Sequence, residues 1–375
     1  MVPSSARLAW IVIGLTGATG GAGTLPVDTA ADAELLAIAG EGFTIHRTDH
    51  FVIAHNTSPE ILKAFVTRAE RTFDGVLRFC RTGGIPVTEL GHRLQMLFFD
   101  TPEGFVRYGR SIGFDQEGAS GVYSPSHNRS AFFNTLNTPQ LAELTRYVED
   151  MENRLAVRPG GAELPAADRI AVQKHLQSVR SQRDRFVTRV NQLVVQHEMA
   201  HQVLYNIGVH TVGAQNPGWL LEGLACLFET PPTRSGAGFG AMNQMRLRDF
   251  RACLTLADDN GPRMENLDRA CRSGRLLPLK DLIADADLFS RGDNPQIVYV
   301  YAQTWSLVHY MQRRHREKLA EYVRQVALRR PGQKFTAEQE IAAFEAVFGP
   351  IDEPLERRWL TFTLDLPYRP EEAGG

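Results

Sequence analysis

The run from Leu193 to Leu204 constrains the fold of this chain more than any other feature of its sequence. It is mostly apolar, contains neither glycine nor proline, and holds the polar residues His197, Glu198 and His201. Such a run predicts a buried helix. Residues four positions apart lie one above the other on a helix, so the two imidazoles share one face. Buried polar groups need partners, and we therefore expect these side chains to meet a ligand inside the protein.

The spacing of the two histidines predicts a metal site. Two imidazoles on one helical face can bind the same ion, and zinc accepts nitrogen ligands of this kind. Glu198 lies about 100° around the helix from His197, so it is placed to reach a water on the ion and not the ion itself. The pKa of a zinc-bound water is about 7, and a nearby carboxylate can accept its proton. The pattern is typical of peptide-bond hydrolysis. The alternative, two solvent-facing histidines beside a glutamate, is disfavoured by the apolar flanks.

Glu222 is the predicted third ligand. Turn residues, among them an Asn-Pro-Gly sequence, lie between His201 and Glu222. They predict that the first helix ends and that a second helix begins near Trp219, with Glu222 in its first turn. Two histidines and one carboxylate leave a fourth position open for water, which is the catalytic pattern of zinc. The alternative is a glutamate favoured at a helix start by the helix dipole. We expect one Zn²⁺ per chain, bound by His197, His201 and Glu222.

The sequence around these residues resembles the gluzincin zinc metallopeptidases of the peptidase MA-like superfamily. His197–His201 matches their HExxH motif, and Trp219–Glu229 is similar to the WLxEGxAxxxE segment of their aminopeptidase-like branch. Gln202 and Asn206 match residues that follow the second histidine in that branch. The closest likeness is to the secreted bacterial peptidase-MA-like domains of unknown function, and it extends over most of residues 40–365.

The resemblance also implies an oxyanion donor. Hydrolysis builds negative charge on the carbonyl oxygen, and a hydrogen-bond donor must meet it besides the metal. The segment Val298–Trp305 looks like the YxKG helix start of the aminopeptidase-like branch, and Tyr301 is the matching tyrosine. A core aromatic on an apolar helix is the alternative, and Tyr299 and His309 are lesser candidates.

Two departures from the family pattern affect the expected activity. The Gly-Ala-Met-Glu-Asn motif that binds the free amine of an aminopeptidase substrate is missing upstream of the zinc helix, so aminopeptidase activity is not implied. Many gluzincins carry an acidic residue one turn after the third ligand, where this chain has Cys226. The group that orients a zinc histidine must then come from elsewhere, and Glu229 and a backbone carbonyl are the candidates.

The order of the predicted elements indicates an α+β fold. Residues 40–135 mix strands with one helix, and the chain from residue 138 onward is nearly all helix. The predicted strands are 43–46, 50–55, 94–99, 121–123 and 129–134. The predicted helices are 59–80 with Ser58 as N-cap, 141–157, 166–207, 279–285, 298–314, 316–327, 337–348 and 355–363. The resemblance implies a small mixed β-sheet lobe packed on a mainly α-helical lobe, zincin-like, with the HExxH on a long helix.

Three segments follow from this order. We assign residues 1–24 to a signal peptide, 25–135 to an N-terminal sheet lobe, and 136–375 to a helical zinc-binding and C-terminal lobe. The two lobes are expected to form one catalytic unit.

Gluzincins hold an extended substrate beside an edge strand through main-chain hydrogen bonds. Arg129–Asn134 is the last strand before the zinc helix and is the predicted edge, although these residues also suit an interior hairpin.

The N-terminus predicts export. Arg7 precedes the apolar core Leu8–Leu15, and Gly20–Ala22 offers small residues for cleavage. The core is too short for a membrane span, so no stable span is expected after cleavage. An uncleaved N-terminal anchor is the alternative. We expect a secreted, periplasmic or cell-envelope protein. Cysteines can pair in such an oxidising compartment, and Cys253 and Cys271 are the candidate bridge.

The composition suits an ordinary enzyme. The chain has 375 residues, 43% of them hydrophobic, and a net charge of -2. It is long enough for one large domain or two lobes with a real core. The net charge gives no electrostatic footprint for nucleic acid. We expect a zinc-dependent metallopeptidase with a peptide or protein substrate and Glu198 as general base. The alternative is a catalytically inactive, zinc-stabilised binding protein of the cell envelope.

Overall fold

A mixed β-sheet forms the first lobe of the protein. The computed structural model describes residues 25–115, 119–156, 166–230, 242–289 and 296–370. The strands of the sheet are β1 (Thr44–Arg47), β2 (Phe51–His55), β3 (Leu94–Phe99), β4 (Gly121–Ser124) and β5 (Arg129–Phe133). Their order is β1-β2-β3-β5-β4, in which β2, β3 and β5 are parallel and the two outer strands are antiparallel to their neighbours. Within the described residues, β1 and β4 are therefore the edge strands.

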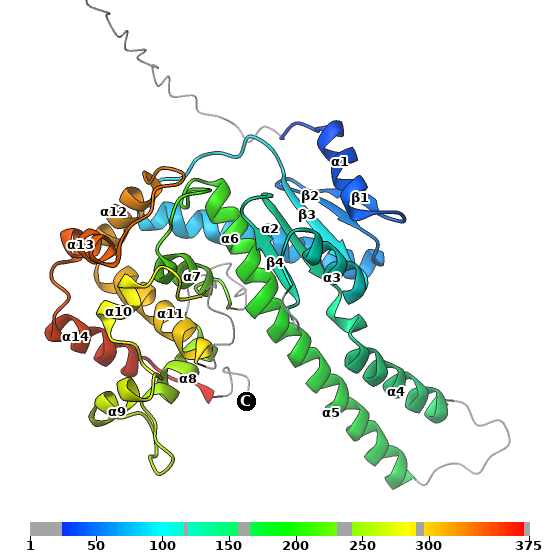
Figure 1. Ribbon diagram of the computed structural model, residues 1–375. Coiled ribbons are helices and arrows are strands. Elements are labelled where there is room, and N and C mark those ends of the chain that lie inside the picture. The colour runs from blue at the N-terminus through cyan, green and yellow to red at the C-terminus, as the bar shows by residue number, and fades with distance from the viewer. Residues whose placement is uncertain (1–24, 116–118, 157–165, 231–241, 290–295, 371–375) are drawn as a thin grey trace, which may run out of the picture.

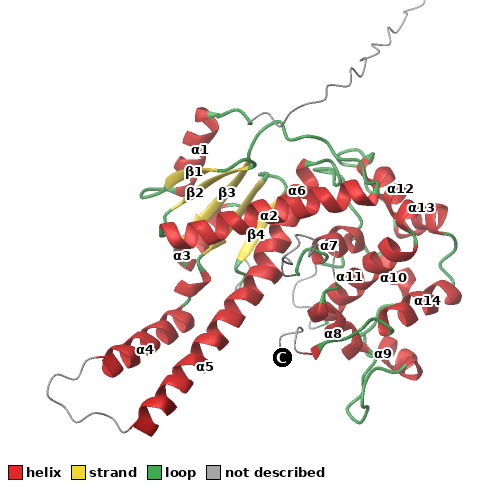
Figure 2. Cartoon of the chain, turned by 180° about the vertical axis from the view of Figure 1, so that it is seen from behind, coloured by secondary structure: helices red, strands yellow, loops and turns green. Residues whose placement is uncertain are grey.

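Helices cover both faces of this sheet. On one face lie α1 (Thr29–Ala39) and α3 (Pro102–Ser111), and on the other lie α2 (Pro59–Gly83) and α6 (His197–Asn206) (Figures 1 and 2). The central strand β3 serves both faces. Leu94, Met96 and Phe98 belong to the apolar core on the α2 side, whereas Leu97 and Phe99 belong to the core on the α1 side. A strand buried on both faces needs a nearly continuous apolar run, which β3 has.

The first long helix has the start that its sequence predicts. The Ser58 hydroxyl accepts a hydrogen bond from the backbone N–H of Ile61 at 3.4 Å. This satisfies one of the free donors at the helix start, so the predicted N-cap is confirmed. The helix is followed by its C-cap residue Gly84, which has a left-handed φ of 73° that glycine adopts at little cost.

The second lobe is helical. Its elements are α7 (Gly218–Cys226), α8 (Gln244–Cys253), η3 (Met264–Asn266), α9 (Leu267–Arg272), α10 (Leu279–Ala284), α11 (Ile297–Arg314), α12 (Arg316–Ala327), α13 (Ala337–Phe348) and α14 (Glu353–Leu364). One apolar core runs from the inner face of the sheet through α6 into this lobe. The predicted α+β architecture, a small mixed sheet lobe packed on a helical lobe, is confirmed.

A helical hairpin extends away from both lobes. After β5 and the short turn η1 (Thr135–Asn137), α4 (Pro139–Ala156) and α5 (Ala166–Val190) run side by side (Figures 1 and 2). The α5 helix continues through a π-helical segment, η2 (Asn191–Gln196), into α6. The predicted helix over 166–207 is thus confirmed as one rod, with wider π turns directly before His197. Such segments are frequently found at functional sites.

The predicted edge strand is wrong. Residues Arg129–Phe133 form β5, which pairs with β3 on one side and with β4 on the other. All five side chains of β5 are buried. The β4–β5 hairpin therefore places β5 inside the sheet and leaves β4 at the edge.

Other expectations were incomplete or wrong. The sequence patterns missed four helices, α1, α3, α8 and α9. The four cysteines are free, so the candidate Cys253–Cys271 bridge is not formed. Cys253 instead lies buried at the end of α8, where its thiol donates to the backbone carbonyl of Asp249 at 3.5 Å. The predicted signal peptide lies outside the described residues. Among the described helices, none has the length and apolar character needed to cross a membrane.

Candidate metal centre

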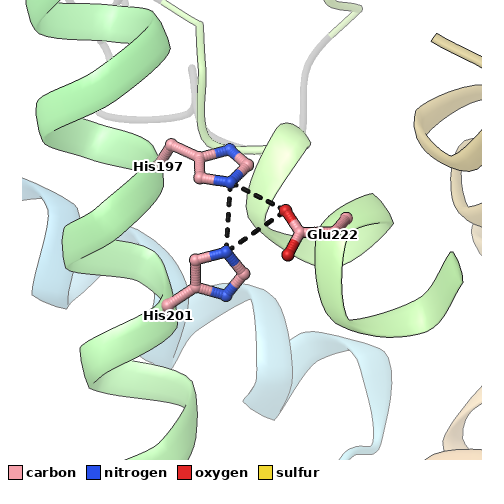
Figure 3. A group of neighbouring side chains, drawn as sticks. All are labelled: His197, His201 and Glu222. Atoms are coloured by element: carbon pink, nitrogen blue, oxygen red, sulfur yellow. Dashed lines mark hydrogen bonds and ion pairs between the residues drawn. The ribbon is translucent and has the colours of Figure 1, made fainter. Parts of the chain in front are cut away.

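Two helices bring the three predicted ligands together. His197 and His201 project from α6 toward Glu222, which projects from α7 (Figure 3). The Nε2 atoms of the two histidines are 3.0 Å apart. The Glu222 Oε2 atom lies 3.0 Å from His197 Nε2 and 3.4 Å from His201 Nε2. These residues can hold a metal ion, because one donor atom of each faces a common point.

The separations between these donor atoms fit a tetrahedral ion. With metal–ligand bonds of about 2.0–2.1 Å, neighbouring ligand atoms of a tetrahedral site lie about 3.3 Å apart. The measured separations of 3.0 to 3.4 Å match this edge length. Two imidazole nitrogens and one carboxylate oxygen are also the donor set of catalytic zinc. The site therefore suits a small divalent cation in both geometry and chemistry.

The electrostatic surroundings keep Glu222 ionised. Burial opposes its ionisation, but the interaction with His201 and hydrogen bonds from both imidazoles hold the pKa of this carboxyl well below its usual range. For His197, burial disfavours the charged form, yet hydrogen bonds with Cys226, Glu222 and Glu229 raise the pKa of the imidazole well above its usual value. Negative charge thus dominates around the Nε2 atoms, as expected where a cation binds.

Glu229 orients the first histidine. The Nδ1 atom of His197 lies 2.9 Å from Glu229 Oε1, and Glu229 is fully buried. A hydrogen bond at Nδ1 fixes the ring so that Nε2 points to the metal position. Glu229 also accepts hydrogen bonds from Arg246 and from the side-chain amide of Asn243. Burial raises its pKa, but the charge of Arg246 and hydrogen bonds with His197 and Arg246 lower the pKa to about 2. Of the two candidate partners of His197, Glu229 is the one that contacts its Nδ1 atom.

Glu198 lies beside the metal ligands and outside their cluster. Its Oε2 atom accepts a hydrogen bond of 2.8 Å from the backbone N–H of Tyr123 on β4. Glu198 lines a cleft of about 490 Å³ together with His197, His201 and Glu222. Burial raises the pKa of Glu198 above its usual value. A carboxylate with a raised pKa, fixed on one oxygen and next to a metal position, has the properties of a proton acceptor.

Tyr301 reaches the same cleft, and the two lesser candidates do not line it. The Tyr301 ring lies on α11, with its centroid 5.9 Å from that of His197. Burial raises the pKa of its phenol, so the hydroxyl keeps its proton and can donate it. His309 is buried against Trp305, with ring centroids 5.4 Å apart, and Tyr299 packs against the main core.

Gln202 and Asn206 fix α6 to the β4–β5 hairpin. The buried Ser130 hydroxyl donates to Gln202 Oε1 at 2.8 Å, and the amide of Gln202 donates to the backbone carbonyl of Gln95 at 2.9 Å. Asn206 exchanges side-chain hydrogen bonds with Asn128 in the hairpin turn, at 2.7 and 2.8 Å. These amides hold α6 in register with the sheet that forms one wall of the cleft.

The sequence patterns missed Arg246 and Asn243. Both belong to α8 or its cap, a short helix with several charged residues that no apolar periodicity marks. Arg246 is buried, and its guanidinium forms a two-pronged bond with Glu229. An isolated buried arginine has no sequence signature, because its partner lies in another element.

Comparison with known protein families matches the part of the chain that builds this centre. No curated protein matches the chain. Residues 191–333 match the family described as "Protein of unknown function (DUF1570)". This segment contains the three ligands, Glu198, Arg246 and Tyr301. The chain is therefore similar, over its candidate metal centre, to a family whose function is unknown.

Proposed function

We propose that this protein is a zinc-dependent metallopeptidase of the gluzincin type, secreted or held at the cell envelope, that hydrolyses a peptide bond. The likeness of the HExxH and WLxEGxAxxxE segments to gluzincins supports this proposal. So does a donor set of His197, His201 and Glu222 that fits a tetrahedral divalent cation. The predicted signal sequence supports export. A bound zinc ion would act as a Lewis acid on water and on the substrate carbonyl.

The position of Glu198 is the observation that carries the proposal. A purely structural metal site has no use for a carboxylate beside its ligands. Glu198 lines the cleft but is not one of the clustered donor atoms. Its Oε2 is fixed by the Tyr123 N–H, which leaves Oε1 for the cleft. In the proposed reaction this carboxylate takes a proton from the attacking water and passes it to the leaving amine.

Tyr301 supplies the proposed oxyanion donor. Its phenol lies in the cleft and stays protonated, because burial disfavours the phenolate. A preorganised donor in a site with little water is worth more than the same donor in solution. The Phe289 and His197 rings pack against the tyrosine ring and fix its direction.

The edge strand β4 is the proposed support for an extended substrate. It pairs with β5 on one side, and its residues 121–123 line the cleft. A peptide that adds to this edge would gain main-chain hydrogen bonds that do not depend on its sequence. The Tyr123 N–H is already bonded to Glu198, so this contact couples the substrate strand to the proton acceptor.

Replacement of Glu198 by glutamine tests the proposed function. The substitution keeps the side-chain size and leaves all three ligands, so the variant should bind zinc as the wild type does. Cleavage of a broad peptide library should fall by at least ~100-fold, the scale of acid–base assistance. Equal cleavage by both proteins would contradict the mechanism. A zinc-loaded wild type that cleaves no peptide would favour the binding-protein alternative.

A further inference from the structure

Arg246 brings a fixed positive charge into the cleft. Among the described residues that line the cleft, it is the one lysine or arginine. Its Nε and Nη2 atoms each donate to Glu229 at 2.7 Å. Its Cζ atom lies 4.8 Å from the centroid of the Tyr301 ring. The carboxylate and the aromatic face together fix the plane of the guanidinium, so little conformational entropy remains to be lost when it binds a ligand.

Among the described residues, one end of this guanidinium has no hydrogen-bond partner. The Nη1 group carries two N–H donors, and no described residue accepts a hydrogen bond from it. Some side-chain atoms of the described residues are fully buried and have no hydrogen-bond partner. The Nη1 atom is not one of them, so it is accessible. Since the residue is 9% exposed and lines the cleft, the accessible donors face that cleft.

Glu229 neutralises Arg246 only in part. Its two oxygens also interact with His197 Nδ1 and with the Asn243 amide, at 2.9 Å each. The charge of one carboxylate is thus divided among three partners, which leaves positive potential at the Nη1 end. The rest of the site does not repel an anion once a metal is held there. The charges of Glu198, Glu222 and Glu229 would balance those of Arg246 and one divalent cation.

We propose that Arg246 Nη1 binds a carboxylate of the peptide substrate, so that the cleft selects peptides with an acidic group close to the cleaved bond. This inference deepens the proposed peptidase function and rests on it. Two sources share the chemistry, the C-terminal carboxylate of a peptide and the side chain of aspartate or glutamate. An arginine donor to a carboxylate forms a charge-assisted hydrogen bond, which is stronger than a bond to a neutral amide.

Twin peptides that differ only in charge test the inference. One pair has the same sequence with a free or an amidated C-terminus, and a second set exchanges an internal glutamate for glutamine at successive positions. Their affinities for the zinc-loaded Glu198→Gln variant are measured by titration calorimetry, which does not require turnover. We expect the acidic member of at least one pair to bind about ten-fold tighter or more, the scale of a charge-assisted hydrogen bond. The pair that responds identifies the source of the carboxylate.

Substitution of the arginine assigns the effect to Nη1. Arg246→Lys, in the Glu198→Gln background, keeps a positive charge for Glu229 but removes the second donor end. It should reduce the preference for the acidic twin to near equality, with zinc content measured in parallel. Arg248→Lys is the matched control, because Arg248 lies on the same helix, bonds to Asp249 and does not line the cleft. It should keep the preference.

Three outcomes would overturn the inference. They are equal affinity for every twin pair, equal weakening of both twins by Arg246→Lys, and no binding of any peptide. If Arg246→Lys weakened the binding of both twins equally, the Nη1 group would bind a neutral main-chain carbonyl of the peptide and not a carboxylate. If Arg246→Lys loses zinc, the inference is still tested by the affinities of the twin peptides for the Glu198→Gln variant, which keeps Arg246. Cleavage of the same peptides by wild type is scored separately. A protein that prefers acidic peptides but cleaves none would contradict the proposed function and leave the inference in place.

Discussion

The carboxylate of Glu229 joins three groups of the candidate metal centre. It meets His197 Nδ1, the Arg246 guanidinium and the Asn243 amide in a fully buried position. Glu229→Gln keeps the size of the side chain but removes its negative charge. It also turns an N–H₂ group toward neighbouring groups that are themselves hydrogen-bond donors. We expect zinc affinity to fall by about 10–100-fold, the usual effect of losing such a partner. Competition with a chromophoric chelator measures this affinity.

The matched control for that variant is Glu321→Gln, whose carboxylate pairs with Arg324 on the exposed surface of α12. This substitution should leave zinc affinity unchanged. Unchanged affinity in Glu229→Gln as well would mean that the carboxylate does not orient His197.

Residue identities at the centre were predictable to different degrees. The two histidines, Glu198 and Glu222 stand in short local patterns, and the structure brings their donor atoms together or into one cleft. Tyr301 could be separated from Tyr299 and His309 only through a resemblance, because a helix of mixed aromatics has no pattern that tells which ring faces a cleft. Arg246 was missed, since its role depends on a partner that lies seventeen residues away.

At the scale of elements, the close approach of β4 to η2, the segment that leads into α6, depends on Gly121. A Cβ atom at this position would lie 2.5 Å from Phe132 Cδ1 and 2.9 Å from Val194 Cγ1, both much closer than carbon atoms approach. The Phe132 ring is fully buried and cannot move aside. Gly121→Ala should therefore push β4 from η2 and weaken the Tyr123–Glu198 hydrogen bond.

We expect this substitution to cost about 1–3 kcal/mol of unfolding free energy, as overpacked cores do. It should also lower kcat on any cleaved peptide. Chemical denaturation and steady-state kinetics measure the two effects. Gly91→Ala is the control, because a Cβ at Gly91 meets nothing within 4 Å and should change neither quantity. A fully stable and active Gly121→Ala would show that β4 does not position Glu198.

A second element-scale contact links the start of β2 to α2. The Nδ1 atom of His50 lies 2.6 Å from Glu70 Oε2, and the hydrogen bond with Glu70 raises the pKa of His50 above 6.5. A group with a raised folded-state pKa stabilises the fold fully below its unfolded pKa, and this stabilisation is lost as the pH rises through the folded pKa.

We therefore expect the unfolding free energy of wild type to fall as the pH rises above about 6.5, the ordinary pKa of histidine, with part of that fall absent in Glu70→Gln. Urea denaturation of both proteins across this range measures the difference. If the unfolding free energies of the two proteins changed with pH in the same way, the His50–Glu70 contact would not stabilise the fold as proposed.

Local sequence patterns predicted the helices and strands themselves better than they predicted which of these elements lie side by side. Apolar runs and periodicity gave the strands and the long helices within a few residues, because burial of one face dictates them. The edge strand could not be predicted, since β4 and β5 are both short and apolar and their order depends on contacts with β3. The short helices α8 and α9 carry many charges and are fixed by the rest of the fold.

At the scale of the whole molecule, one apolar core joins the sheet lobe to the helical lobe. The cluster contains side chains from β2, β3, α2, α6, α7 and α11, so neither lobe buries its inner face without the other. The candidate metal position lies where the two lobes meet, with two of its predicted ligands on α6 and one on α7. The pairing of a sheet lobe with a helical lobe was predictable from the order of elements. The protruding α4–α5 hairpin was not, because its sequence reads as an ordinary pair of helices.

The zinc content of the purified protein tests the central claim most directly. Wild type, freshly purified, supplied with zinc and freed of excess metal, is measured by mass spectrometry of the metal alongside His201→Ala and the control His127→Ala. His127 is exposed and lies in the β4–β5 turn. The account predicts about one zinc per chain in wild type and in His127→Ala, and most of it lost in His201→Ala. A wild type without zinc, or a His201→Ala variant that keeps it, would contradict the account.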